Sequence, residues 1–138
     1  MAGYSGTPLV RKLGIAEGVR VALLAAPANF AITLGDLPPG ATTTNRLAGT
    51  QLFDVIVAFV KARDDLAPRI ATARAKLTPA GGLWIAWPKK SSGVVTDMTE
   101  DAIREVALPT GLVDNKVCAI DETWSGLRLV LRRELRPA

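Results

Sequence analysis

Three short, nearly continuous apolar runs are the feature that most constrains the fold of this chain. They occupy residues 19–25, 53–60 and 83–87. Runs of this length and composition are typical of strands covered on both faces, as in a parallel sheet between layers of helices. Helical patterns lie between the runs. The alternation therefore predicts a Rossmann-like three-layer α/β sandwich with a mostly parallel sheet.

The remaining elements follow from local patterns. Capping residues and apolar stripes predict helices over about residues 7–13, 28–34, 66–77 and 99–108. The candidate N-caps are Thr7, either Asp64 or Asp65, and either Asp97 or Thr99. Polar, threonine-rich residues 41–47 favour a strand nearer an edge. Residues 116–132 predict a strand, a turn over 121–126, and a last strand that pairs antiparallel.

Composition limits the possible functions. The 138 residues predict one domain over 1–138. The single cysteine, Cys118, cannot form an internal disulfide, which favours a reducing cytoplasm. The absence of histidine excludes Ser-His-Asp and Cys-His catalysis and any histidine-ligated metal. A net charge of +4 with few aromatic residues does not predict specific nucleic-acid binding. No signal peptide or membrane-spanning run is apparent.

The order of elements resembles the methyltransferase branch of Rossmann-like folds, in which the last strand inserts antiparallel. The chain from about Tyr4 to Arg133 also resembles a bacterial family of small proteins of unknown function. The segments that carry this second resemblance are YSGTPL (4–9), APANF (26–30), WIAWPKK (84–90), TD (96–97), GLVDNKVC (111–118) and WSGL (124–127). The resemblance implies a fold and implies no activity.

The positions that usually bind a cofactor in such folds are altered. Adenosylmethionine and dinucleotide binders usually place glycines after the first strand and an acid after the second. Here the first strand is followed by AAPAN (25–29), and the second by TNRL (44–47) without an acid. We therefore expect no cofactor. A cavity beside Pro27 that admits adenosine would keep a divergent methyltransferase open as an alternative.

The third apolar run ends in a polar tip, WPKKSSG (87–93). Ligands of open α/β sheets bind beyond the carboxyl ends of the strands. Ammonium and hydroxyl groups there can form an anion site, and a tryptophan face can stack on a base or a cation. The candidate ligand-binding residues are Lys89, Lys90, Ser91, Ser92, Lys61, Arg63, Trp87 and Asn29. A solvated loop that keeps the protein soluble explains the same residues.

Several other residues have a structural and a functional interpretation. Trp124 is either a lid over the last strands or the wall of a pocket or partner interface. Asp97, Glu100 and Asp101 either cap a helix or supply a general base. We expect Cys118 to be a buried thiol rather than a nucleophile. We name no catalytic residue and no metal ligand.

Three functions remain open from the sequence. The first is a non-catalytic module that binds a protein partner or a second copy of itself, with homodimerisation through an edge strand or a helix face. The second is a binder of small anions or nucleotides at Lys89-Lys90-Ser91-Ser92. The third is a divergent adenosylmethionine-dependent methyltransferase.

Overall fold

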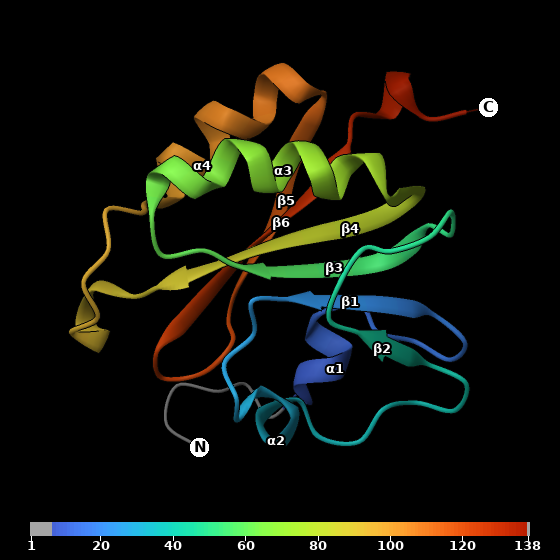
Figure 1. Ribbon diagram of the computed structural model, residues 1–138, viewed down its shortest axis with the longest axis horizontal. Helices are drawn as coiled ribbons and strands as arrows, with labels where there is room; N and C mark the ends of the chain where they lie inside the picture. The colour runs from blue at the N-terminus through green and yellow to red at the C-terminus, as the bar shows by residue number, and fades with distance from the viewer. Residues whose placement is uncertain (1–6, 138) are drawn as a thin grey trace.

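A six-stranded sheet with the spatial order β2-β1-β3-β4-β6-β5 organises the part of the chain that is described (Figure 1). The structure is a computed structural model and describes residues 7–137. The strands are β1 (Arg20–Leu24), β2 (Thr42–Thr44), β3 (Phe53–Phe59), β4 (Leu77–Pro88), β5 (Leu112–Ala119) and β6 (Trp124–Leu131).

The direction of the strands confirms the predicted fold class. β2, β1, β3 and β4 run parallel, whereas β6 inserts antiparallel between β4 and the edge strand β5. The strands β1 and β3 are nearly continuous apolar runs because helices cover both of their faces. On β6, Leu127 and Leu129 are two residues apart and therefore face the same core.

Helices cover both faces of the sheet (Figure 1). α1 (Leu9–Lys12) and α2 (Phe30–Leu34) pack on one face, and α3 (Leu66–Ala75) and α4 (Glu100–Ala107) pack on the other. Short 3₁₀ segments lie at the ends of several elements: η1 (Arg63–Asp65), η2 (Lys90–Ser92), η3 (Leu108–Thr110) and η4 (Arg133–Leu135). In the described residues no helix is long and apolar enough to cross a membrane.

β4 divides the hydrophobic interior into two cores. Trp84 faces α1 and α2, and its Nε1–H donates a hydrogen bond to the carbonyl of Leu13 at 3.0 Å. Trp87 faces α3 and α4. Both are buried, with exposures of 0% and 9%. The predicted placement of the two tryptophans on opposite faces is confirmed, because they are three residues apart in an extended strand.

The start of β4 corrects the predicted end of the third helix. α3 ends at Ala75, and Leu77, which the apolar stripe assigned to the helix, already pairs with Phe53. Gly82 pairs with Val55, so four residues of β4 bulge between two nearby positions of β3. Periodicity cannot show this irregularity, because pairing across strands decides it.

The caps also differ from some predictions. Thr99, and not Asp97, caps α4: its Oγ1 accepts a hydrogen bond from the backbone N–H of Ala102 at 3.0 Å. α1 begins at Leu9 after Pro8, without a side-chain cap from Thr7. Asp65 is the N-cap residue of α3 but makes no capping bond with its side chain.

The C-terminal strands are longer than predicted. β5 begins at Leu112 rather than at residue 116, and Trp124, assigned to the turn, is the first residue of β6. The polar residues between 114 and 116 hid the start of β5, because they lie on an edge strand where solvent reaches them.

Candidate functional site

A groove lies at the carboxyl edge of the sheet, between the ends of β1 and β2. Its volume is about 790 Å³. The loop after β1 forms one wall and the exposed edge strand β2 forms the other. The lining residues are Leu23, Ala25, Ala26, Pro27, Ala28, Phe30, Ala31, Thr43, Thr44 and Asn45. The groove therefore lies where sheets of this kind usually bind their ligands.

The chemical character of the groove is polar but uncharged. Among the described residues that line it, none carries an ionisable side chain. Thr43 and Thr44 bring hydroxyl groups, Asn45 brings an amide, and Leu23 and the alanines bring apolar surface. Such a lining can pack against a ligand and form hydrogen bonds with it, but it supplies no general acid or base.

Ala25 gives the groove an unusual backbone. Its φ of 57° makes it the one described residue other than glycine with a positive φ. This left-handed conformation is costly for a residue with a Cβ. Backbone strain of this kind clusters at ligand sites. The turn after β1 thus keeps a conformation that suits glycine, although the glycines are absent.

A second hollow of about 570 Å³ continues beyond the end of β1 toward α3. Ala25 lines both hollows. The second one brings in charged groups, because Lys61, Asp65 and Arg69 lie on its wall. The end of β1 therefore stands between an uncharged groove and a mixed-charge hollow.

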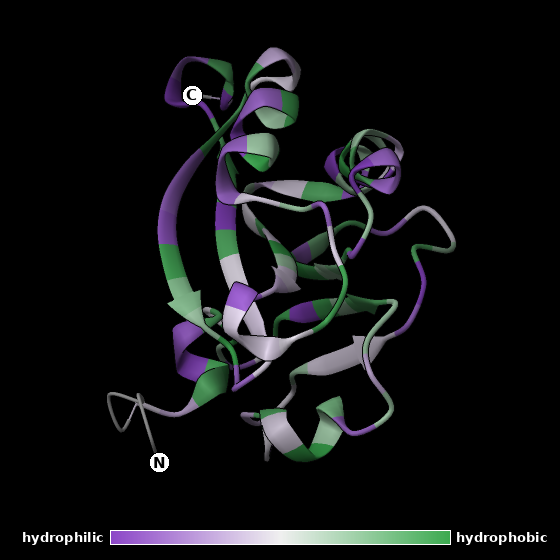
Figure 2. Ribbon diagram, turned by 90° about the vertical axis from the view of Figure 1, so that its left-hand side faces the viewer, coloured by the Kyte–Doolittle hydropathy of each residue, from purple (hydrophilic) through white to green (hydrophobic). Residues whose placement is uncertain are grey.

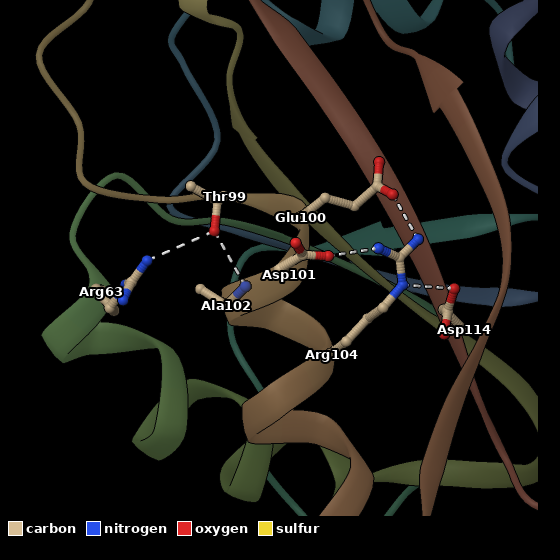
Figure 3. Close-up of polar contacts among 7 residues, drawn as sticks. All are labelled: Arg63, Thr99, Glu100, Asp101, Ala102, Arg104 and Asp114. Atoms are coloured by element: carbon tan, nitrogen blue, oxygen red, sulfur yellow. Dashed lines mark hydrogen bonds and ion pairs between the residues drawn. The ribbon is translucent and has the colours of Figure 1, made fainter.

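The loop after β4 folds back onto the end of β3. The Thr96 hydroxyl donates to the carbonyl of Lys61 at 2.5 Å, and Asp97 Oδ1 accepts from the backbone N–H of Arg63 at 2.7 Å. The guanidinium of Arg63 points to Thr99 Oγ1 at 3.5 Å (Figure 3). Asp97 and Arg63 therefore hold two neighbouring strand ends together.

Some polar groups of the predicted Lys-Lys-Ser-Ser tip form hydrogen bonds within their own loop. The hydroxyl of Ser92 donates to the carbonyl of Lys89 at 2.6 Å and accepts from the N–H of Val94 at 3.1 Å. Lys90 and Ser91 are exposed, and Lys89 is partly buried. Among residues 7–137, no carboxylate forms an ion pair with Lys61, Lys89 or Lys90.

The structure does not bring all predicted ligand-binding residues together. Lys90 and Trp87 line a hollow of about 580 Å³, but Asp97, Glu100 and Asp101 share its wall, which gives it mixed charge. Other predicted residues lie apart from that hollow. Lys61 lines the hollow toward α3, and Asn29 is exposed at the start of α2.

Trp124 belongs to an aromatic cluster. Its ring meets Phe59 edge-on at a centroid distance of 5.0 Å, and Phe59 meets Phe30 in the same way at 4.9 Å. The ring is partly buried against the core under α1 and α2. It therefore covers the end of that core.

The acidic residues of α4 are engaged by Arg104 (Figure 3). Its Nε donates to Asp114 at 3.0 Å, and its two terminal nitrogens donate to Glu100 and Asp101. The hydrogen bonds to Asp114 and Glu100 raise the pKa of Arg104. Arg104 thus joins α4 to β5 through Asp114, while Glu100 and Asp101 pair with it within the helix, which supports their structural interpretation over that of a general base.

Cys118 has the environment of an unreactive thiol. Burial raises its pKa, and the nearby charges of Lys12 and Lys116 only partly oppose this effect. A thiol with a raised pKa carries little thiolate at neutral pH. In the described part of the chain, no group of three or more acidic or cysteine side chains gathers as a metal site.

The groove lies beside Pro27, where a cavity was the condition for a divergent methyltransferase, but none of its lining residues was among the predicted ligand-binding residues. Its alanines carry no chemical signal, and a left-handed alanine looks like any other alanine in a sequence. The polar run of threonines at β2, followed by Asn45, was the one available signal, and it predicted only an edge strand and the absence of a ribose-binding acid.

Solved structures with a similar fold include several methyltransferases. An adenosylmethionine-dependent methyltransferase from Aquifex aeolicus is 10% identical with a TM-score of 0.63, covering 88% of this chain and 86% of that chain. A ribosomal protein L11 methylase from Lactobacillus delbrueckii subsp. bulgaricus is 10% identical, with a TM-score of 0.60 and coverages of 91% and 75%. Fibrillarin from Aeropyrum pernix, with natively bound adenosylmethionine, is 16% identical, with a TM-score of 0.56 and coverages of 93% and 70%.

These likenesses establish the fold alone, because identities this low do not carry function. No curated protein matches the sequence. Residues 46–133, however, match a family described as a protein of unknown function, DUF3052. The match extends from the loop after β2 to the residues that follow β6 and covers more than half of the chain. The chain, with its methyltransferase-like fold, therefore belongs to the DUF3052 family.

Proposed function

We propose that the domain is a non-catalytic binding module whose groove between β1 and β2 holds an uncharged nucleoside-like ligand. The observation that carries the proposal is the combination of volume and lining. About 790 Å³ lies within the usual size of small-molecule pockets, roughly 300–1,000 Å³. Leu23 can pack against a ring, while Thr43, Thr44 and Asn45 can form hydrogen bonds with hydroxyl groups.

The usual determinants of adenosylmethionine do not fit this groove. Side chains stand where glycines would let the backbone approach the cofactor, and Pro27 has no N–H to donate. At the end of β2 the groove is lined by the amide of Asn45 rather than a carboxylate for the ribose. These residues therefore give no support to a methyl-transfer step.

A divergent methyltransferase is the second candidate, and one observation favours it. The groove lies beside Pro27 and has the volume to admit adenosine. This candidate predicts transfer of a methyl group from adenosylmethionine. The binding module predicts ligand binding without turnover.

Amide chemical shifts of the ¹⁵N-labelled protein, titrated with adenosine and separately with adenosylmethionine, test the proposal. We expect saturable shifts at Ala25, Ala28, Phe30 and Thr44 with adenosine. Absence of these shifts would contradict the proposal. Labelled methyl groups that leave adenosylmethionine in the presence of the protein would favour the methyltransferase instead.

A pair of tryptophan substitutions locates the binding. Ala28→Trp places an indole in the groove, and Ala75→Trp places one at the exposed end of α3. We expect Ala28→Trp to abolish the adenosine shifts and Ala75→Trp to preserve them. Equal binding by both variants would show that adenosine binds elsewhere.

A further inference from the structure

A basic cluster lies on the face of β5 and β6 that carries α1, with β3 and β4 between it and the groove. Arg128 of β6 stands directly opposite Lys116 of β5. Directly opposed side chains of an antiparallel pair share a face, with Cβ atoms about 4.5–5.5 Å apart. The ammonium of Lys116 donates to the carbonyl of Lys12 at 3.1 Å. Figure 2 shows the hydrophilic middle of β5 along the edge of the sheet.

Gly82 makes room for the Arg128 guanidinium. A Cβ on Gly82 would meet the Cζ and Nη2 atoms of Arg128 at 2.8 Å. The guanidinium therefore lies against the backbone of β4, and its charged group is partly buried. A glycine at this position explains how a sheet face can hold a cation so close to its backbone.

Arg128 has no counter-charge in the described chain. Across residues 7–137, its side chain makes neither an ion pair nor a hydrogen bond. Its pKa is lowered by burial and then by the positive charge of Arg136, and no acidic group opposes these two effects. Arg104 shows the contrast, since three carboxylates hold it.

Keeping such a cluster costs stability. A partly buried cation without a partner loses hydration that nothing replaces. Like charges opposed across two strands also repel each other. The Arg128–Lys116 pair therefore has the character of an incomplete site, because an added anion would relieve both costs.

We propose that Arg128 and Lys116 form a binding site for a phosphate group. A guanidinium offers parallel N–H donors that match two oxygens of a phosphate, and an ammonium adds a point charge. Two cations balance the charge of a phosphate monoester, roughly −1.5 to −2 at pH 7. The site is independent of the uncharged groove.

Titration of the whole ¹⁵N-labelled protein with inorganic phosphate at constant ionic strength tests the site. We expect saturable shifts of the Arg128 Nε–H and of the Lys116 and Gly82 amides, which chloride does not produce. Arg128→Gln and Lys116→Gln should each weaken phosphate binding by about tenfold, because each removes a charged hydrogen-bond donor. The absence of saturable shifts at these groups would overturn the proposal.

Two further variants separate charge from geometry. Lys90→Gln removes one positive charge at the end of β4 and should leave phosphate binding unchanged. If Lys90→Gln loses as much affinity for phosphate as Arg128→Gln does, the anion binds at the predicted Lys-Lys-Ser-Ser tip instead. Gly82→Ala keeps every charge but displaces the guanidinium, so it should weaken phosphate binding as Arg128→Gln does.

Stability and a second probe complete the test. In phosphate-free buffer, Arg128→Gln should raise the midpoint of thermal unfolding, because it removes an uncompensated charge. A lowered midpoint would contradict the assignment of Arg128 to an incomplete site.

A ten-nucleotide single strand, titrated in parallel, identifies the source of the phosphate. Tighter binding than inorganic phosphate indicates a nucleic-acid backbone, whereas equal or weaker binding indicates a small phosphate ligand.

Discussion

At the scale of single residues, Ala25 has a strained backbone at the carboxyl edge of the sheet. Its φ of 57° costs a residue with a Cβ about 1–3 kcal/mol. It lies at the point where the two hollows beside β1 meet.

Replacement of this alanine by glycine should therefore stabilise the fold. We expect Ala25→Gly to raise the free energy of unfolding by roughly 0.5–1 kcal/mol, because relief of strain exceeds the added entropy of the unfolded chain. Urea unfolding measures the change. Ala28→Gly is the matched control and should lower the same free energy, since Ala28 has no positive φ to relieve. A loss of stability in Ala25→Gly would contradict the claim that the backbone of Ala25 is strained.

Trp84 combines burial with a hydrogen bond across 71 residues of sequence. We expect Trp84→Phe to lower the free energy of unfolding by about 2–4 kcal/mol, because it leaves a cavity and an unpaired Leu13 carbonyl. Trp124→Phe keeps a ring against Phe59 and should cost about 1 kcal/mol or less. Equal losses in the two variants would contradict the role of the indole N–H.

The raised pKa of the Cys118 thiol leads to a prediction for the stability of the protein in alkaline solution. Burial raises the pKa of the folded thiol above its ordinary value of about 8.5. Its contribution to stability is therefore complete below the unfolded pKa and is lost as the pH rises through the folded pKa. Above about pH 8.5, the free energy of unfolding should fall more steeply in the natural protein than in Cys118→Ala. Parallel pH profiles would contradict the raised pKa.

At the scale of elements, α4 depends on one threonine. Thr99 Oγ1 caps the helix by accepting from the N–H of Ala102, and it also accepts a hydrogen bond from the guanidinium of Arg63 in η1. We expect Thr99→Ala to lower the free energy of unfolding by about 1 kcal/mol, measured by urea denaturation. Thr42→Ala, on the exposed edge strand, should cost less. A Thr99→Ala variant as stable as the natural protein would show that the cap contributes nothing.

The elements differ in how well sequence patterns predicted them. β1 and β3 were recognised because burial on both faces leaves an unbroken apolar run. The bulged start of β4 and the polar start of β5 were not, because cross-strand pairing and an edge position replace the apolar pattern there. Thr99 and Asp97 were rival caps in the sequence; in the structure Asp97 accepts instead from the backbone N–H of Arg63 in η1, and Thr99 caps the helix.

At the scale of the whole molecule, β4 couples the two cores. Its residues alternate between them, with Trp84 and Ala86 on one side and Leu83, Ile85 and Trp87 on the other. Loss of this strand would open both cores at once. We therefore expect one cooperative transition, with far-UV circular dichroism and tryptophan fluorescence changing at the same urea concentration. Two separated transitions would contradict the coupling.

The sequence alone determined the layer architecture, the parallel sheet with its antiparallel insertion, and the loss of the cofactor glycines and acid. These properties depend on burial patterns and residue types, which are local. Only the tertiary structure decided that Ala25 is left-handed beside an uncharged groove, and that Arg128 lies over Gly82 opposite Lys116. These properties depend on strand register and on the path of the chain through the fold, which bring together residues far apart in sequence.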